Sequence, residues 1–184
     1  MMIYHFTLIL TGVEAHTPGL ENTLFECGCD DALLCFYGDS VYLEFDRDGD
    51  SFEQAVLSAI ADIEGGALPA RVVAVDATLL GLSDIAQRSQ LSRQAVAMLK
   101  DGTRGPGRFP APVQRLAGHS PLWRWASVAR WLHENGKLSD ELAENAQVME
   151  NINLALALRE TPQRQYVTQL AARLDRAAGK EEAI

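Results

Sequence analysis

The sequence predicts an α+β protein in three parts, and three observations lead to this division. Residues 1–77 alternate between strand-like and helix-like hydrophobic patterns. Residues 78–135 contain two short helical segments, a stretch rich in glycine and proline, and an aromatic segment. Residues 136–184 contain two longer helical patterns separated by a proline. With 184 residues, 47% of them apolar, the chain has room for one large domain or two small ones with real cores.

The first part reads as strand, helix, strand, strand, helix, strand. Its strands alternate apolar with polar residues or are short apolar runs, and its second helix has the spacing of an amphipathic helix. The expected elements are a strand over 4–10, a helix from Thr17-Pro18 to about Gly28, strands over 32–37 and 41–46, a helix over 52–63 and a strand over 71–76. This order is that of the split βαβ, ferredoxin-like arrangement, with both helices on one face of the sheet.

The acidic stretch at residues 46–50, DRDGD, is predicted to be a turn. A calcium-binding EF-hand loop needs its glycine at the sixth position and a distant bidentate glutamate, and neither requirement is met. Ser51 and Gln54 have the spacing of a capping box, so we expect the next helix to begin here.

We expect no metal, no cofactor and no enzymatic activity. Cys27, Cys29 and Cys35 with His5 lack a second matched pair of zinc ligands, and cysteine is often simply buried. The sequence has no glycine-rich phosphate loop and no nucleophile-elbow motif. The other histidines have no partner at a recognisable catalytic spacing.

Residues 82–99, LSDIAQRSQLSRQAVAML, predict two short helices joined by a tight turn. Ser83 and Ser92 are placed to cap them, because each hydroxyl can accept a hydrogen bond from an unpaired backbone N–H. The apolar residues expected to face inward are Ile85, Ala86, Leu91, Val96 and Leu99. The residues expected on the exposed side of the second helix are Ser92, Arg93, Gln94, Ala97, Met98 and Asp101. Reading the DNA major groove requires such a polar, basic helix N-terminus on a rigid support.

The next residues predict a flexible turn followed by a small aromatic core. The turn is GTRGPG, residues 102–107, and the stretch FPAPV that follows cannot be helix interior because it holds two prolines. We expect Trp123 in the core, Trp125 either in the core or capping the next helix, and that helix over residues 127–132.

From Leu79 to Leu132 these motifs resemble the winged helix-turn-helix of the MerR, excisionase and phage-activator type. The whole chain resembles small bacterial proteins that join such a module to an acidic N-terminal domain. The resemblance implies that the helix over 92–100 reads the major groove and that a hairpin wing at the GTRGPG turn follows the backbone or enters the minor groove. Gln90 departs from the family, which often has glycine there; it fits if the turn differs or if it adopts a left-handed conformation.

Side-chain chemistry assigns contacts to individual residues of this region. Arg93 and Gln94 are the candidates for base edges, because arginine suits guanine and glutamine suits adenine. Basic and hydroxyl side chains around them are candidates for phosphate contacts. The full set of predicted DNA-binding residues is Ser92, Arg93, Gln94, Ala97, Lys100, Arg104, Arg108 and Arg124.

The net charge of −9 argues against nucleic-acid binding until its distribution is considered. Residues 1–78 hold 14 acids and 2 bases, residues 79–135 hold 3 acids and 8 bases, and residues 136–184 hold 8 acids and 6 bases. Charges more than about 10 Å apart are largely screened at 0.1 M salt, so binding to DNA depends on the local field. A basic middle between acidic ends therefore suits a DNA-binding module.

The last part predicts a helix from Ser139 and a second one over 163–178. Leu142, Met149 and Leu156 are seven residues apart, which is a short heptad-like stripe. The two helices either form an antiparallel hairpin or pair with a second copy of the chain. We expect a homodimer, because linking two half-sites strengthens DNA binding.

Together these patterns predict a sequence-specific DNA-binding regulator that binds double-stranded DNA through residues 78–135. Residues 1–77 would sense a small molecule, dimerise or bind a protein partner, and residues 136–184 would dimerise or bind a partner. The alternative is an interaction module, antitoxin-like or a phage-encoded adaptor, whose acidic domain grips a protein. With neither a basic leader nor about 18 consecutive apolar residues, we expect a cytoplasmic protein that does not enter the membrane.

Overall fold

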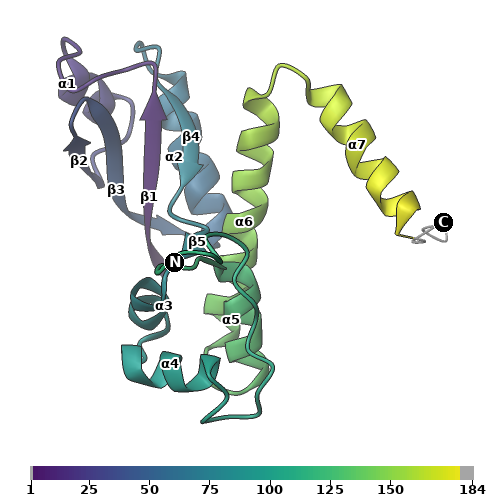
Figure 1. Ribbon diagram of the computed structural model, residues 1–184. Coiled ribbons are helices and arrows are strands. Elements are labelled where there is room, and N and C mark those ends of the chain that lie inside the picture. The colour runs from purple at the N-terminus through teal and green to yellow at the C-terminus, as the bar shows by residue number, and fades with distance from the viewer. Residues whose placement is uncertain (1, 179–184) are drawn as a thin grey trace.

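The computed structural model describes residues 2–178, which form a four-stranded sheet, a two-stranded sheet and seven helices (Figure 1). In chain order the elements are β1 (Met2–Thr11), α1 (Leu20–Glu26), β2 (Ala32–Tyr37), β3 (Ser40–Gly49), α2 (Phe52–Gly65), β4 (Arg71–Val75), β5 (Leu79–Leu80), α3 (Leu82–Ser89), α4 (Arg93–Lys100), β6 (Trp123–Arg124), α5 (Trp125–Glu134), α6 (Asp140–Glu160) and α7 (Arg164–Ala177). The predicted α+β class is confirmed. Within residues 2–178, no helix combines the length and the apolar character that a membrane span requires.

The four-stranded sheet is antiparallel throughout and has the strand order β2-β3-β1-β4. Alternate residues of the central strands are buried on one face, where the rings of Phe6 and Phe45 stack 5.2 Å apart. Helix α2 packs its apolar stripe against this face, and α1 adds two buried leucines to the same core. The opposite face of β1, β2 and β3 carries exposed residues.

Helix α1 begins later than the expected start at Thr17-Pro18. The hydroxyl of Thr17 accepts a hydrogen bond from the backbone N–H of Glu14 at 2.8 Å, so these residues close a turn. Gly19 then adopts a left-handed conformation with φ 72°, and the helix starts at Leu20. Proline at position 18 therefore belongs to the turn before the helix.

The prediction of a turn over residues 46–50 is wrong, because strand β3 continues to Gly49. Its residues alternate between exposed carboxylates, Asp46 and Asp48, and buried positions, as in the rest of the strand. The capping prediction is confirmed: Ser51 Oγ accepts the N–H of Gln54 at 3.1 Å.

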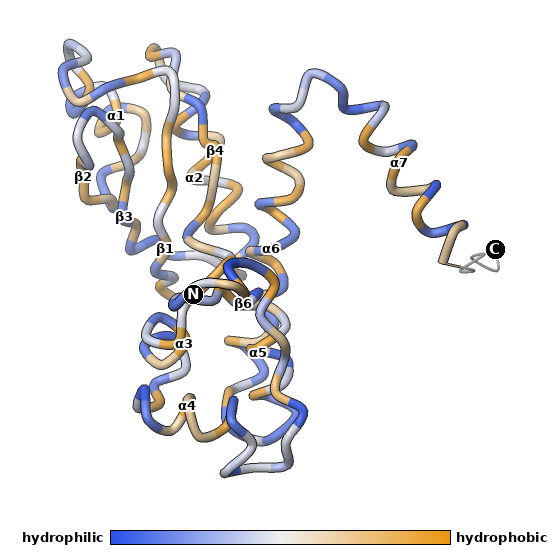
Figure 2. The backbone as a smooth tube through the Cα atoms, in the orientation of Figure 1, coloured by the Kyte–Doolittle hydropathy of each residue, from blue (hydrophilic) through white to orange (hydrophobic). Residues whose placement is uncertain are grey.

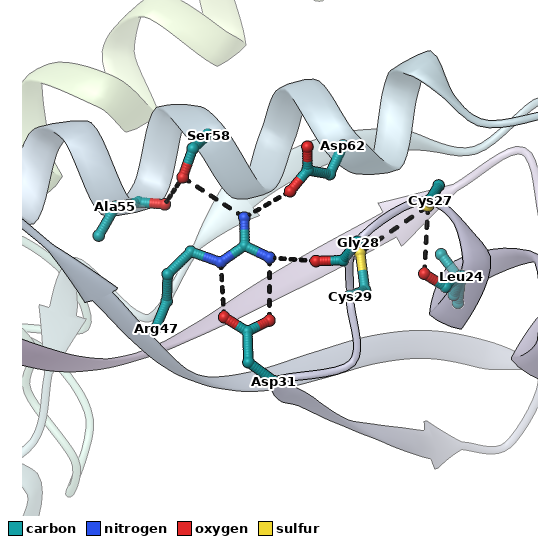
Figure 3. Close-up of polar contacts among 9 residues, drawn as sticks. All are labelled: Leu24, Cys27, Gly28, Cys29, Asp31, Arg47, Ala55, Ser58 and Asp62. Atoms are coloured by element: carbon teal, nitrogen blue, oxygen red, sulfur yellow. Dashed lines mark hydrogen bonds and ion pairs between the residues drawn. The ribbon is translucent and has the colours of Figure 1, made fainter.

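The strand continues because Arg47 points into the protein and is only 7% exposed (Figure 3). Its guanidinium donates to both carboxylate oxygens of Asp31 at 2.7 and 2.9 Å, to Asp62 at 2.7 Å and to the carbonyl of Gly28 at 2.6 Å. The bonds to Asp31 outweigh burial and raise the pKa of Arg47. One side chain thus joins β3 to α2 and to the loop before β2.

The chain leaves the sheet at Asp76, which has a positive φ of 46° although it is not glycine. Its N–H donates to the carbonyl of Thr7 at 2.9 Å, and its Oδ1 accepts the N–H of Thr7 at 3.1 Å. Burial raises the pKa of this carboxyl, and the charge of Arg88 opposes that shift. Two hydrogen bonds to β1 therefore fix the direction in which the second unit begins.

Helix α6 covers the outer edge of β4. The side-chain amide of Asn153 accepts the N–H of Val75 at 2.9 Å and donates to its carbonyl at 2.7 Å. Arg159 donates to both carboxylate oxygens of Glu64 and to the carbonyl of Val72, and Glu64 accepts the N–H of Val72 at 2.9 Å. An edge strand with free N–H and C=O groups invites pairing with other chains, and these side chains occupy them instead.

The N-terminal half of α6 packs on α5, which belongs to the second unit. This unit consists of α3, α4, α5 and the two-stranded sheet of β5 and β6, in which Leu79 pairs with Arg124 and Leu80 with Trp123. The backbone N–H of Trp125 donates to the carbonyl of Thr78 at 2.8 Å, so α5 begins at Trp125 rather than at residue 127. Both tryptophans are buried, in agreement with the core alternative.

The heptad-like stripe is buried within its own chain. Met149 and Leu156 pack in the core, whereas Leu142 is 39% exposed. The helical hairpin, one of the two arrangements predicted for these helices, is not formed: α7 leaves the end of α6, diverges from it (Figure 1) and has no buried residue. The stripe on α6 is therefore occupied by α5 and β4, and α7 is left uncovered over the described residues.

We predict that Arg47→Lys lowers the free energy of unfolding by about 2 kcal/mol, because the three N–H donors of lysine cannot serve the four oxygen atoms of Asp31, Asp62 and Gly28 that the guanidinium bonds. Urea denaturation followed by circular dichroism measures the change. Arg71→Lys, in the exposed ion pair with Glu160, is the control and should stay within about 0.5 kcal/mol. Equal effects of the two substitutions would contradict the role given to Arg47.

Asn153→Ala is expected to lower the free energy of unfolding by about 1–3 kcal/mol, since it leaves the N–H and C=O of Val75 without partners. Hydrogen exchange at the Val75 amide should accelerate in the same variant. Asn151→Ala, on the exposed side of the same helix, should change stability by less than about 0.5 kcal/mol. Unchanged exchange at Val75 would show that α6 does not hold the edge of β4 in solution.

Candidate nucleic-acid interface

Helices α3 and α4 are joined by a tight turn at Gln90. Gln90 has φ 56° and ψ 26°, the left-handed conformation that the sequence-based argument allowed for a residue other than glycine. The N–H of Leu91 donates to the carbonyl of Ala86 at 3.0 Å, which closes the turn. Ser92 Oγ then accepts the N–H of Ala95 at 3.1 Å, so its predicted capping role is confirmed.

The first helix is capped differently from the prediction. Ser83 lies inside α3, and Gly81 is the N-cap residue. The carboxylate of Asp84 accepts the N–H of Gly81 at 3.2 Å. An acidic side chain in the first turn also complements the partial positive charge of the helix N-terminus.

The inward face of the two helices is as predicted. Ile85, Ala86, Val96 and Leu99 are buried, and Leu91 is partly buried against them. Behind them lies the aromatic segment, where Phe109 meets Trp131 edge to face at 5.1 Å and Trp123 donates to the carbonyl of Pro110 at 3.0 Å. The helix pair therefore rests on a packed support.

The exposed side of α4 begins with Arg93 and Gln94 in its first turn. Ala97 and Met98 are half-buried on the next turn, and Lys100 is exposed at the end of the helix and pairs with Asp101. These residues form a continuous strip along α4, which starts at the helix N-terminus and carries no acidic residue in its first turn. Such a strip has the charge and polarity of a groove-reading helix.

The hairpin is displaced from the position expected for a wing. Residues 102–107 form no strand; Thr103 and Arg104 instead donate their backbone N–H groups to the carbonyl of Met98. An antiparallel bridge forms later, between Gln114 and Leu122, next to the pairing of β5 with β6. The turn at residues 102–107 folds onto the end of α4 because Gly105 lies against Leu99, where a Cβ would come within 2.9 Å.

The loop that closes this hairpin brings in a residue that the sequence analysis missed. Arg115 follows the bridge at Gln114, is exposed, and has φ 55°. The sequence does contain a pattern that indicates this hairpin: residues 118–120 (GHS), which are typical of turns, lie between two short segments that can pair. Arg104 and Arg108 are also exposed on the same long connection between α4 and β6.

Other basic residues of this region contact α6 through their side chains. Arg124, which was predicted to contact phosphate, forms an ion pair with Glu150 at 2.6 Å. Arg130 donates to Gln147 at 3.0 Å, and Arg88 contacts the sulfur of Met149 at 3.6 Å. Among the described residues of this region, the exposed arginines that form neither an ion pair nor a side-chain hydrogen bond to α6 are Arg93, Arg104, Arg108 and Arg115.

The charges of the chain are separated in space as they are in sequence. Helix α4 and the long connection after it lie at the end of the molecule opposite the four-stranded sheet (Figure 1). The strongly acidic residues 1–78 form that sheet and its helices. A polyanion could therefore approach the basic end without meeting most of the acidic surface.

No family model, curated protein or solved structure matches this chain.

We predict that Gln90→Gly stabilises the protein by about 0.5–1 kcal/mol, because glycine adopts the left-handed conformation without the steric penalty of a Cβ. Gln87→Gly, in the preceding turn of α3, should have the opposite sign and destabilise by about 1 kcal/mol. Thermal unfolding of both variants measures the two changes in stability. Destabilisation by Gln90→Gly would mean that the turn has another conformation.

Proposed function

We propose that this protein is a cytoplasmic, sequence-specific regulator of transcription that binds double-stranded DNA. The observation that carries the proposal is the strip on α4: Arg93 and Gln94 stand exposed at the N-terminus of a helix that is held by a second helix and a packed aromatic segment. In this proposal α4 enters the major groove, where Arg93 reads guanine and Gln94 reads adenine. Lys100 contacts phosphate.

The long connection after α4 takes the part of the wing. The hairpin at Gln114 and Leu122 takes the position of the wing beside the DNA. Arg115 on this hairpin joins Arg104 and Arg108, in the segment before it, as contacts to the backbone or the minor groove. This arrangement of two helices, hairpin and following helix supports a winged helix-turn-helix of the MerR and excisionase type. Arg124 is left out of the interface because its ion pair with the largely buried Glu150 holds it against α6, whereas the partner of Lys100, Asp101, is exposed.

The acidic unit is proposed to be a ferredoxin-like domain that dimerises the protein. The strand order β2-β3-β1-β4, with both helices on one face, supports this description. A homodimer would place two α4 helices on two half-sites and multiply the affinity of a small reading surface.

A second candidate function is an interaction module whose acidic domain binds a basic protein. The exposed carboxylates Glu44, Asp46 and Asp48 on β3 favour it, since such a row attracts a cationic partner. In that case the helix-turn-helix would be secondary and would bind DNA weakly and without sequence preference.

The experiment that tests the proposal is selection of binding sites from random duplex DNA by the full-length protein, followed by titration of the selected site with salt. An enriched inverted repeat would support a dimeric regulator, and its half-site spacing would follow from the protein's two-fold symmetry. Enrichment of a single short site would support sequence reading by a monomer. No enrichment, with only weak and salt-sensitive binding, would overturn the proposal in favour of the interaction module.

Arg93→Ala is expected to weaken binding to the selected site by about 1–3 kcal/mol and to relax specificity at one base pair. Lys100→Ala should instead weaken binding to every sequence alike and reduce the slope of log affinity against log salt by about one unit. Fluorescence anisotropy on matched and single-mismatch duplexes separates the two patterns. Arg71→Ala, on the acidic unit, serves as the control and should bind DNA like the unaltered protein; a uniform loss for Arg93→Ala would make it a phosphate contact.

A further inference from the structure

Helix α7 has an apolar face that nothing covers over the described residues. Tyr166, Leu170 and Leu174 recur at the four-residue spacing of one helix face; Tyr166 and Leu174 are 50% and 69% exposed, and Leu170 between them is partly buried. Figure 2 shows apolar segments recurring along α7, which stands apart from the rest of the chain. Isolated helices of about 14 residues are marginal in water, so an uncovered helix of this length needs a partner surface.

The outward-facing residues of β1, β2 and β3, here called the open face, form a second uncovered surface. Its apolar part includes Ile9, Leu33 and Tyr37, and the last two are 63% and 84% exposed. Its acidic part is the row Glu44, Asp46 and Asp48 on β3. Glu44 pairs in register with Leu33 on β2, so the two parts adjoin each other. A hollow of about 600 Å³ adjoins the acidic part; Glu44 and Asp46 line it together with residues of β1, α2, α5 and α6.

The two surfaces are complementary in charge. Helix α7 carries Arg164, Arg173 and Arg176 against the single acid Asp175. At 100° per residue, Arg173 lies at the border of the apolar face, about 60° from Leu170, whereas Arg164 lies about 120° away on the other side. An apolar stripe bordered by arginine thus matches an apolar patch bordered by carboxylates.

The spacing along the two surfaces also agrees. Leu170 and Arg173 are three residues apart, about 4.5 Å along the helix axis. Ile9 pairs with Tyr42, and Glu44 lies two residues further along β3, about 6.6 Å. The reach of an arginine side chain spans the difference, so Leu170 could rest on Ile9 while Arg173 meets Glu44.

We propose that α7 docks on the open face of a second copy of this chain, and that the second copy returns the same contact. Within one chain α7 diverges from α6 and lies apart from the sheet (Figure 1), so the contact is made between copies. Pairing of α7 with another α7 is disfavoured, because each helix carries an excess of arginine. Because the dimer has two-fold symmetry, it contains two such contacts. The surface area that they bury together is twice that of one contact, which brings it closer to the range of about 1,200–2,000 Å² that specific interfaces bury.

This inference deepens the dimer part of the proposed function and is tested without DNA, so its failure leaves DNA binding as a separate question. The test is a charge exchange in the full-length protein, with molar mass measured by light scattering across a dilution series. Arg173→Glu and Glu44→Lys are each expected to raise the dimer dissociation constant about tenfold or more. An equimolar mixture of the two variants should restore dimers. One contact of the mixed dimer then joins the introduced glutamate to the introduced lysine, and the other joins the unaltered Arg173 and Glu44.

Two matched pairs complete the design. Leu170→Asp should abolish the dimer, whereas Thr168→Asp, on the opposite side of the same helix, should leave it intact. Arg164→Glu should likewise leave it intact, although it makes the same charge change as Arg173→Glu. Circular dichroism and thermal unfolding check that each variant retains its fold.

Several results would overturn the inference. A chain that remains monomeric at every concentration has no such interface. A dimer that survives Leu170→Asp is formed elsewhere. A dimer that is lost in Arg173→Glu but unaffected by Glu44→Lys uses α7 on another surface, and a mixture that fails to restore dimers rules out the pairing of these two residues.

Discussion

The arrangement of the whole chain depends on one helix, α6, which is bonded to the edge of β4 at one end and packed on α5 at the other. Asn153 and Arg159 satisfy backbone groups that a free edge strand would expose, while Arg88, Arg124 and Arg130 reach α6 from the second unit. Helix α6 thus contacts both units, which are also joined along the chain by the short connection at Asp76. The exposed surface of α4 therefore has a defined direction relative to the sheet.

The interior of the acidic unit shows how a buried charge is accommodated. Arg47 is surrounded by two carboxylates and a carbonyl, and its Cζ lies 4.9 Å from the centre of the Phe45 ring. Burying a lone guanidinium would be very unfavourable, so Asp31 and Asp62 must be in place for β3 to keep its register. This requirement ties the loop before β2, β3 and α2 into one packed unit.

The sequence was sufficient for elements with strong periodicity. The amphipathic stripe of α2, the alternation of β1 and the apolar face of α3 and α4 all lie where the pattern predicts. The errors have specific physical causes. Residues 46–49 look like a turn because carboxylates and glycine are typical of turns, yet the partners of Arg47 come from 15 and 16 residues away along the chain. Of the candidate site, the exposed strip of α4 could be predicted from the sequence. The ion pair that occupies Arg124 and the position of the hairpin depend on contacts with α6 and β5, which no local pattern contains.

Because α6 covers the edge of β4, the sheet unit of this chain depends on a helix that lies outside residues 1–77. Residue 77 is a boundary of topology, but a fragment ending there would present Val72 and Val75 with open hydrogen-bonding groups and Glu64 without its arginine. Such a fragment would tend to associate edge to edge. The unit of autonomous folding is therefore longer than the unit of topology, and inheritance of the sheet module by another protein would require a substitute for α6 as well as the strands themselves.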